Sequence, residues 1–470
     1  MKREKSLLIN SLLFFFGSLG KGVASIIIVF IGSFYILPDE MGIYDLVVST
    51  ISLVQPIIIF QINDGIYRWL LDKDNSKEDV IKCGFRVAYR NMIITNVLMV
   101  IGFMMFDFDH KILIAILLNL NCLYPIFQQI TRGLKNHKIF AVSGIITGVS
   151  VLSISFIGME FFDMGVEAFY IAQIVSNVAG MVYLGITQKI SISPFNGNEK
   201  EIKKHSKPMQ KYAIMLVPNS INQWMMKALD KFCILFYFTP YENGIYTVAH
   251  RFPDILIMLN NMFYSAWIEQ SISEYDSDDR DEYFSKIYNI YTKIIISIVL
   301  LAIPVTKYIM RFTTGAKYAD AYKYVPFLYI GVIFLGLSGF VGTGYLSTKK
   351  TEGILFTSLA GSFVNVATNM VFMPLFGLQI AGVAFVAGYL AMWIIRVIST
   401  RKFFKIDIQW GMFISLLGLT VVSALLVQLN NTLVDVIMMI VAIIITVIIN
   451  RDILKVVCEK VANKVYKRNK

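Results

Sequence analysis

Charged side chains are scarce in this sequence. Asp, Glu, Lys and Arg together make up 16% of its 470 residues, whereas a soluble domain carries roughly a quarter. This deficit excludes a soluble globular protein, because the chain has too few ionic groups to cover its surface in water. Hydrophobic residues account for 56% of the chain. We therefore expect a membrane protein that crosses the bilayer many times.

Cysteine is also rare, and the motifs of common enzyme classes are missing. The four cysteines are scattered without a CxxC pair, which argues against a disulfide framework and a structural zinc site. The sequence has no GxxxxGK[ST] phosphate loop and no HExxH metal motif. We therefore predict no catalytic residue, no metal site and no bound cofactor, so that transport is favoured over catalysis.

Long apolar runs account for most of the chain. A spanning helix needs about 20 mostly apolar residues, and this rule predicts an all-α polytopic protein with about 14 transmembrane helices. The predicted spans cover residues 7–37, 42–62, 87–107, 112–131, 139–158, 165–187, 212–238, 244–268, 287–310, 324–347, 353–374, 379–400, 409–429 and 433–450.

The positive charges are distributed unevenly between alternate connections. One set of connections holds 31 Lys and Arg residues and the opposite set holds 5, among them Lys307. Because basic residues gather on the cytoplasmic side, this ratio places both termini in the cytoplasm. The net charge of +11 thus reflects membrane orientation and does not predict nucleic-acid binding.

A short internal repeat indicates two halves. Residues 38–44 (PDEMGIY) and 240–246 (PYENGIY) agree at five of seven positions, and both follow the first span of a six-helix group. Parallel repeats of this kind build alternating-access transporters. We predict two six-helix halves in a pseudo-twofold repeat plus a C-terminal helix pair. The boundaries are 1–190 for the first half, 191–211 for a cytoplasmic linker, 212–402 for the second half, 403–450 for the pair and 451–470 for a basic tail.

Several ionisable residues fall inside the predicted spans, where they are costly and usually mark a pathway or substrate site. Lys21 divides the first span into two pieces that are each too short to cross the membrane. The seventh span carries Lys227, Asp230 and Lys231 within one turn, so Lys231 is expected to be surplus positive charge. A buried ion pair with an acidic residue remains the alternative for Lys21.

Further polar residues extend this pattern. Arg251 and Asp254 repeat the i, i+3 spacing in the eighth span, while Arg68, Arg90 and Asp64 lie nearer the cytoplasm, where interfacial anchoring is an equal alternative for the arginines. The seventh span also holds possible glycan contacts, namely Trp224, Gln223, Asn222 and Asn219. A central cavity lined by Lys and Arg suits a polyanion such as a phosphate or pyrophosphate.

Several segments resemble the Wzx-type polysaccharide flippases of the multidrug/oligosaccharidyl-lipid/polysaccharide exporter superfamily. These segments are residues 38–47 (PDEMGIYDLV), 61–72 (QINDGIYRWLLD), 132–145 (RGLKNHKIFAVSGI), 218–234 (PNSINQWMMKALDKFCI) and 244–256 (GIYTVAHRFPDIL). The family commonly has Arg where Lys231 stands. The order of the segments and the helix number match across most of the chain, which implies a MATE-like fold.

The resemblance implies a flippase in the bacterial inner membrane. Its substrate would be an undecaprenyl-pyrophosphate-linked oligosaccharide for capsule, exopolysaccharide or O-antigen assembly, and a polysaccharide polymerase and a chain-length regulator would be its partners. The pyrophosphate would pair with Lys21, Lys227, Lys231 and Arg251, and the glycan would lie near Trp224. A proton or sodium gradient is the candidate energy source, with Asp230, Asp254 or Asp64 as the coupling carboxylate.

Three alternatives remain open at this point. A cation-coupled multidrug exporter of the same superfamily has the same architecture, but its cavity should favour acidic residues. A membrane enzyme such as the polymerase needs a large catalytic outer loop, which the sequence does not contain. A lipid II flippase carries nearly the same cargo chemistry, and the sequence separates it poorly from a polysaccharide flippase.

Overall fold

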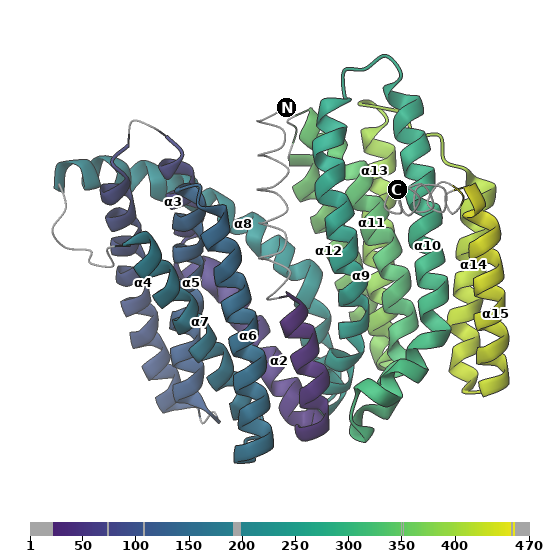
Figure 1. Cartoon of the computed structure of the whole chain (residues 1–470), viewed down its shortest axis with the longest axis horizontal. Helices are drawn as coiled ribbons and strands as arrows, with labels where there is room; N and C mark the ends of the chain where they lie inside the picture. Colours follow the sequence, from purple (N-terminus) through teal and green to yellow (C-terminus); the bar gives the residue numbers. More distant parts are fainter. Residues whose placement is uncertain are drawn as a thin grey trace, which may run out of the picture. The chain divides into compact units, whose positions relative to one another are not determined.

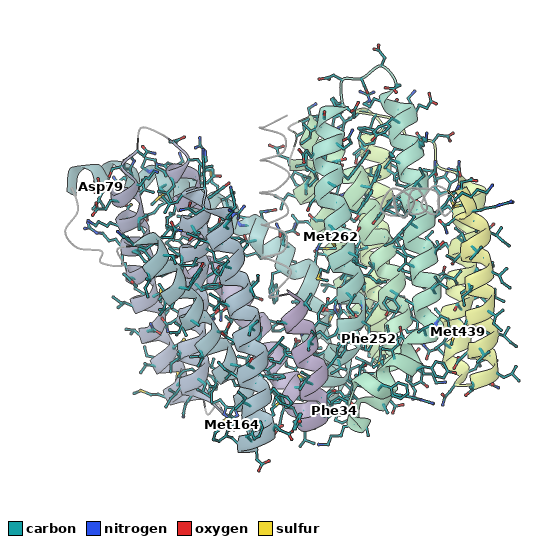
Figure 2. All side chains as sticks on the ribbon, viewed as in Figure 1. Phe34, Asp79, Met164, Phe252, Met262 and Met439 are labelled. Atoms are coloured by element: carbon teal, nitrogen blue, oxygen red, sulfur yellow. The ribbon has the colours of Figure 1, made fainter. Side chains whose placement is uncertain are left out.

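Helices make up most of the described structure of the protein. The computed structural model describes residues 22–72, 75–106, 109–190, 199–348, 350, 352–452 and 455, and no strand occurs among them. Each predicted span coincides with a described helix over most of its length, apart from the part of the first span that precedes Gly22. Apolar side chains such as Phe34, which is 53% exposed, stand on the outer surface (Figure 2). This distribution is expected of helices that face lipid.

The helices form two compact units, which Figure 1 colours along the chain. Unit 1 comprises residues up to Phe232 together with Thr239–Gly244, and unit 2 comprises Cys233–Phe238 and everything from Ile245 onward. Unit 1 contains the helix Gly22–Tyr35, α2 (Pro38–Ile58), α3 (Ile62–Leu70), α4 (Lys77–Met105), α5 (Lys111–Gly133), α6 (His137–Phe162), α7 (Glu167–Gln188), most of α8 (Glu199–Tyr237) and the first turn of α9 (Pro240–Ser273).

Unit 2 contains the remainder of α9 and the C-terminal helices. These are α10 (Arg280–Thr313), η1 (Ala316–Tyr324), α11 (Val325–Ser347), α12 (Glu352–Phe376), α13 (Gln379–Thr400), α14 (Trp410–Leu426), η2 (Val427–Leu429) and α15 (Thr432–Ile449). α11 is the most deeply buried candidate span and packs against α13 and α10, whereas α14 and α15 lie together beside α10 (Figure 1).

Eleven helices are long and apolar enough to cross a membrane among the described residues. The helix Gly22–Tyr35 is apolar but shorter. The long helices α8 and α9 carry too many polar residues to meet the same criterion. The fold is therefore that of a polytopic membrane protein, while the number fourteen stays a prediction.

Three details differ from the sequence-based expectations. Helix α8 begins at Glu199, so residues 199–211 of the predicted linker are helical. The second predicted span ends early, because Phe60 and Gln61 adopt left-handed backbone angles that separate α2 from α3. Lys307 does not lie in a connection: it is buried within α10, 2.8 Å from the Asp435 carboxylate of α15.

The two copies of the internal repeat begin α2 and α9 in the same way. Each places a proline at the first helical position and a glutamate two residues later. The Glu40 carboxylate accepts the Leu37 N–H at 3.3 Å, and the Glu242 carboxylate accepts the Thr239 N–H at 3.0 Å. The repeated PxE pattern is thus a helix start, in which the acidic side chain satisfies a backbone donor that the helix leaves free.

The repeated glycines explain why both copies are needed in this form. Gly42 lies against the Pro240 carbonyl and Gly244 lies against the Pro38 carbonyl, so a side chain at either position would collide with backbone. Asn243, which is fully buried, donates its Nδ2 hydrogen to the Gly42 carbonyl at 2.9 Å. The two motifs are therefore in reciprocal contact, and each glycine permits the close approach of the other helix start.

Candidate functional site

A charged cluster lies where α8 packs against α2 in unit 1. Trp224 and Lys231 are seven residues apart on α8, and Asp45 and Ser49 are four residues apart on α2, so each pair shares one face of its helix. The Lys231 Nζ lies 2.7 Å from Asp45 Oδ2 and 3.3 Å from Ser49 Oγ. The Trp224 Nε1–H donates to the Ser49 carbonyl at 2.8 Å. We call these four residues the lysine cluster.

The lysine cluster is largely shielded from solvent. The side chain of Lys231 is 14% exposed and that of Asp45 is 6% exposed. The expectation that Lys231 supplies surplus positive charge is therefore wrong for this conformation, because Asp45 neutralises it. The ring of Phe232 lies 5.3 Å from the ring of Trp224, which orients the indole beside the amine. Chemically, the cluster offers a cation whose single carboxylate partner an anionic ligand can replace.

The remaining predicted residues of α8 take different positions. Asp230 is buried, and its Oδ1 accepts the backbone N–H of Lys231 at 3.0 Å. Asn222 is buried, whereas Gln223 and Asn219 are exposed. The side chain of Lys227 lies outside the described residues, as does Lys21 with its whole surroundings. The predicted pairing of Lys227 with Asp230 therefore stays a prediction.

A second polar group lies on α9 in unit 2. The Arg251 Nη1–H donates to Asp254 Oδ2 at 3.2 Å, which confirms the predicted i, i+3 pair. The His250 Nδ1 lies 3.1 Å from the other oxygen of the same carboxylate. Through this direct contact with Asp254, His250 is part of the same group. The carboxylate thus bridges an arginine and a histidine.

The residues predicted near the cytoplasm do not join these groups. The Arg68 Nη1–H donates to the Asp72 carboxylate at 2.7 Å, and this hydrogen bond raises the pKa of Arg68. The side chains of Arg68 and Asp72 are each 49% exposed. Such an exposed pair contributes little to stability and fits the anchoring alternative.

Arg90 and Asp64 likewise contact mainly amides. Arg90 is exposed on α4 and donates to Asn91 Oδ1 at 3.1 Å. The Asp64 carboxylate accepts hydrogen bonds from Gln61 Nε2 at 2.8 Å and from Gln129 Nε2 at 2.6 Å. Asp64 therefore links α3 to α5 within unit 1, and Arg68, although four residues away on the same helix, is paired elsewhere.

Two important charged residues were overlooked in the sequence. Asp45 lies one turn inside a predicted span and directly follows the repeated motif, so the rule for ionisable groups at membrane depth applies to it. Arg396 on α13 is 6% exposed, and its guanidinium donates to Thr357 Oγ1 at 2.9 Å and to the Ser338 carbonyl at 3.0 Å. The same rule identifies Arg396, which ties α13 to α12 and α11.

The chain is similar to known proteins in both sequence and fold. Residues 36–323, more than half of the chain, match the family described as polysaccharide biosynthesis protein. The solved structure of the lipid II flippase MurJ in an inward closed conformation is similar with a TM-score of 0.66 at 13% identity, covering 95% of this chain and 100% of that chain.

Multidrug transporters have a similar fold. An inward-facing multidrug resistance MATE transporter of the MOP superfamily gives a TM-score of 0.52 at 14% identity, covering 84% of this chain and 94% of that chain. A MATE structure in the straight conformation gives 0.57 at 12% identity, covering 85% and 95%. No curated protein sequence matches the chain. At these identities the structural likeness establishes the fold alone, and the MATE-like architecture is confirmed.

Proposed function

The chain belongs to the family of polysaccharide biosynthesis proteins, and from this premise we propose that it is a flippase for lipid-linked oligosaccharides. Its cargo would be an undecaprenyl-pyrophosphate-linked repeat unit, moved from the cytoplasmic to the outer leaflet of a bacterial inner membrane by alternating access. Both chain termini would lie in the cytoplasm. Capsule, exopolysaccharide and O-antigen assembly are the processes that use such cargo, with a polymerase and a chain-length regulator as partners.

The observation that carries this proposal is the ion pair of the lysine cluster. The Lys231 ammonium and the Asp45 carboxylate lie 2.7 Å apart and compensate each other's charge, and removal of one of them takes an opposite charge away from the other. A pyrophosphate carries more negative charge and more acceptor oxygens than Asp45, so it can displace the carboxylate from Lys231. The neighbouring indole of Trp224 offers an apolar face of the kind on which a sugar ring packs.

Energy coupling requires a group that changes its charge during the cycle. A proton or sodium gradient would supply the energy for transport. Asp254 is the best placed of the candidate coupling carboxylates, since it contacts both His250 and Arg251. Asp64 is held by hydrogen bonds from two glutamine amides. Asp230 remains a third candidate beside the lysine cluster.

A multidrug exporter is the second candidate function, because MATE transporters share the fold. The pairing of Lys231 with Asp45 also means that the cluster has no net positive charge in this conformation. The two candidate functions differ in the charge of the cargo. Cationic drugs need a carboxylate that is free to receive them, whereas a lipid pyrophosphate needs the amine.

Export of surface glycan tests the proposal in cells. We expect Lys231→Ala to abolish export in a strain that depends on this protein, while Lys82→Ala, a control in the same unit, supports export. Lys82 is a suitable control because it is also buried and paired, with Glu78 at 2.5 Å. Normal glycan export by a Lys231→Ala protein that is present at wild-type amounts would contradict the proposed role of the amine.

A further inference from the structure

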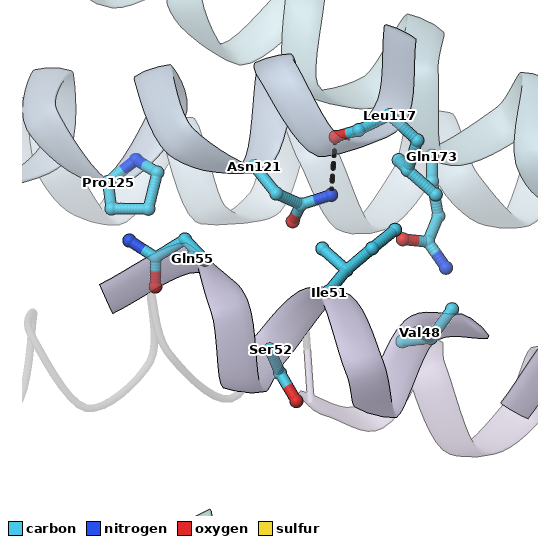
Figure 3. A pocket seen from close by; sticks show the side chains of 8 residues that line it. All are labelled: Val48, Ile51, Ser52, Gln55, Leu117, Asn121, Pro125 and Gln173. Atoms are coloured by element: carbon cyan, nitrogen blue, oxygen red, sulfur yellow. Dashed lines mark hydrogen bonds between the residues drawn. The ribbon is translucent and has the colours of Figure 1, made fainter. Parts of the chain in front are cut away.

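A separate cavity lies within unit 1, between α2, α5 and α7. Its volume is about 170 Å³, and Figure 3 shows the side chains that line it. The eight described residues that line it are all uncharged. In the part of the chain that the structure describes, no ionic group therefore faces the cavity to attract the pyrophosphate or a cation, and the cavity differs in this respect from the lysine cluster.

The polar groups of the cavity are amides and one hydroxyl. Gln55 on α2, Asn121 on α5 and Gln173 on α7 come from three different helices and lie around the same space (Figure 3). Ser52 on α2 also lines the cavity, one turn before Gln55, and its hydroxyl donates to the Ser49 carbonyl at 2.7 Å. Amides both donate and accept hydrogen bonds, so the lining matches a ligand that carries several neutral hydroxyl groups.

Much of this hydrogen-bonding capacity is unused by the protein. The side-chain amide of Gln55 has no partner among the described residues, and Asn121 spends one Nδ2 hydrogen on the Leu117 carbonyl at 2.9 Å. Gln173 donates its Nε2 hydrogen to the Tyr44 hydroxyl, which leaves its Oε1 available. Pro125, which also lines the cavity, has no N–H to give to the Asn121 carbonyl one turn earlier on α5.

The volume of the cavity and its apolar lining residues further restrict which ligands can fit. Drug-sized ligands occupy pockets of about 300–1,000 Å³, so this cavity is too small for a typical drug and suits a single ring. Ile51 and Leu117 supply apolar walls, against which the C–H groups of a ring can pack. A ring with one polar edge and one apolar face describes a pyranose.

We propose that this cavity binds one uncharged sugar residue of the cargo and thereby reads the glycan separately from its pyrophosphate. The inference rests on the proposed function, because it assumes a glycan-bearing lipid. It assigns Gln55, Asn121 and Gln173 as specificity residues. It also predicts that a sugar carrying a carboxylate is excluded from the cavity, since none of the described lining residues compensates its charge.

Binding of defined lipids to the full chain tests this assignment. The probes are undecaprenyl pyrophosphate without sugar and the same lipid carrying one glucose, galactose, N-acetylglucosamine or glucuronic acid, each added to purified protein and quantified by native mass spectrometry. We expect at least one neutral-sugar lipid to bind about fivefold more tightly than the sugar-free lipid, the difference that one neutral hydrogen bond supplies. The glucuronate lipid should show no such gain.

The variants separate the cavity from the rest of the molecule. Gln55→Met and Asn121→Leu should each remove the sugar-dependent gain while leaving sugar-free lipid bound as in the wild type. Asn119→Leu is the matched control on α5, because its amide pairs with Asn96 of α4 at 2.8 Å and does not line the cavity. Gln55→Met is expected to fold normally, since the Gln55 amide has no described protein partner.

Each outcome decides between the two proposals. Loss of the gain in Gln55→Met and Asn121→Leu but not in Asn119→Leu supports the sugar site. If the wild type binds all lipids equally, or if the cavity variants keep their preference, the sugar site is wrong and the flippase proposal stands. If the wild type binds none of the pyrophosphate lipids, the proposed function itself fails.

Discussion

Replacement of Lys231 by methionine removes the ammonium group from the lysine cluster while keeping a side chain of similar length. The Asp45 carboxylate, whose side chain is 6% exposed, then loses the ammonium that lies 2.7 Å away. Removal of one partner from a fully buried pair costs about 3–5 kcal/mol. Because Lys231 is 14% exposed, water already compensates part of its charge, and we expect a smaller loss of about 2 kcal/mol in the free energy of unfolding.

The reverse substitution and the double substitution complete a thermodynamic cycle. Asp45→Leu should also cost about 2 kcal/mol, whereas the double variant Lys231→Met, Asp45→Leu should lose only about 1 kcal/mol, because an apolar pair replaces the ion pair without an orphaned charge. The coupling energy is then about 3 kcal/mol, at the upper end for residues in direct contact. Chemical unfolding of the purified protein in mild detergent measures all four corners of the cycle.

The same variants should rank differently in lipid binding than in stability. Asp45→Asn leaves the Lys231 amine without a carboxylate to displace, so we expect tighter binding of undecaprenyl pyrophosphate than in the wild type. The double variant Lys231→Met, Asp45→Leu should be nearly as stable as the wild type and yet lose binding, because the amine is gone. Additive stability losses together with unchanged lipid binding in all variants would show that the pair is neither coupled nor part of the site.

Two further predictions concern the fold, and each pairs a substitution with its control or compensating change. Gly42→Ala should greatly reduce the yield of folded protein in size-exclusion chromatography, because the new Cβ would collide with the Pro240 carbonyl. Gly102→Ala should leave the yield unchanged, because a Cβ at that position has no neighbour within 4 Å. Equal yields for the two variants would contradict the close contact of the two helix starts. Asp435→Leu should destabilise unit 2 by about 3–5 kcal/mol, because it leaves the buried Lys307 amine without its carboxylate. Adding Lys307→Met to the same chain should recover most of this stability. If chemical unfolding shows no recovery, loss of the ion pair is not the cause of the destabilisation.

Most of the helices were predictable because hydropathy and length identify eleven of them among the described residues. An apolar run of about 20 residues has few alternatives to a spanning helix in a bilayer. The break between α2 and α3 was not predictable in this way. It depends on left-handed backbone angles at Phe60 and Gln61, which are uncommon in residues other than glycine, asparagine and aspartate and have no local signal here.

The candidate site was predictable in its residue types and less so in its pairings. Lys231, Trp224 and Arg251 stand out as polar residues inside apolar spans. The partner of Lys231 is Asp45, which lies far away in sequence, and this contact arises only when α8 packs against α2. By contrast, the partner of Arg251 lies three residues further along the same helix, and the i, i+3 spacing identified it.

The cavity between α2, α5 and α7 shows the same limitation. Gln55, Asn121 and Gln173 come from three helices, and each alone is an ordinary polar residue in a span. Their convergence depends on how the helices of unit 1 pack. Only Pro125 carries a local signal, since a proline inside a helix always frees the carbonyl four residues earlier.

Reconstituted transport tests most directly whether this protein moves a lipid-linked glycan through the lysine cluster. Purified protein in liposomes is supplied with undecaprenyl-pyrophosphate-linked oligosaccharide on one leaflet, and the glycan that reaches the other leaflet is measured by its accessibility to an added lectin. We predict protein-dependent appearance of the glycan that is lost with Lys231→Ala and kept with Lys82→Ala. Translocation no faster than in protein-free liposomes would contradict transport of a lipid-linked glycan. Equal rates for Lys231→Ala and the wild type would contradict the role of the lysine cluster.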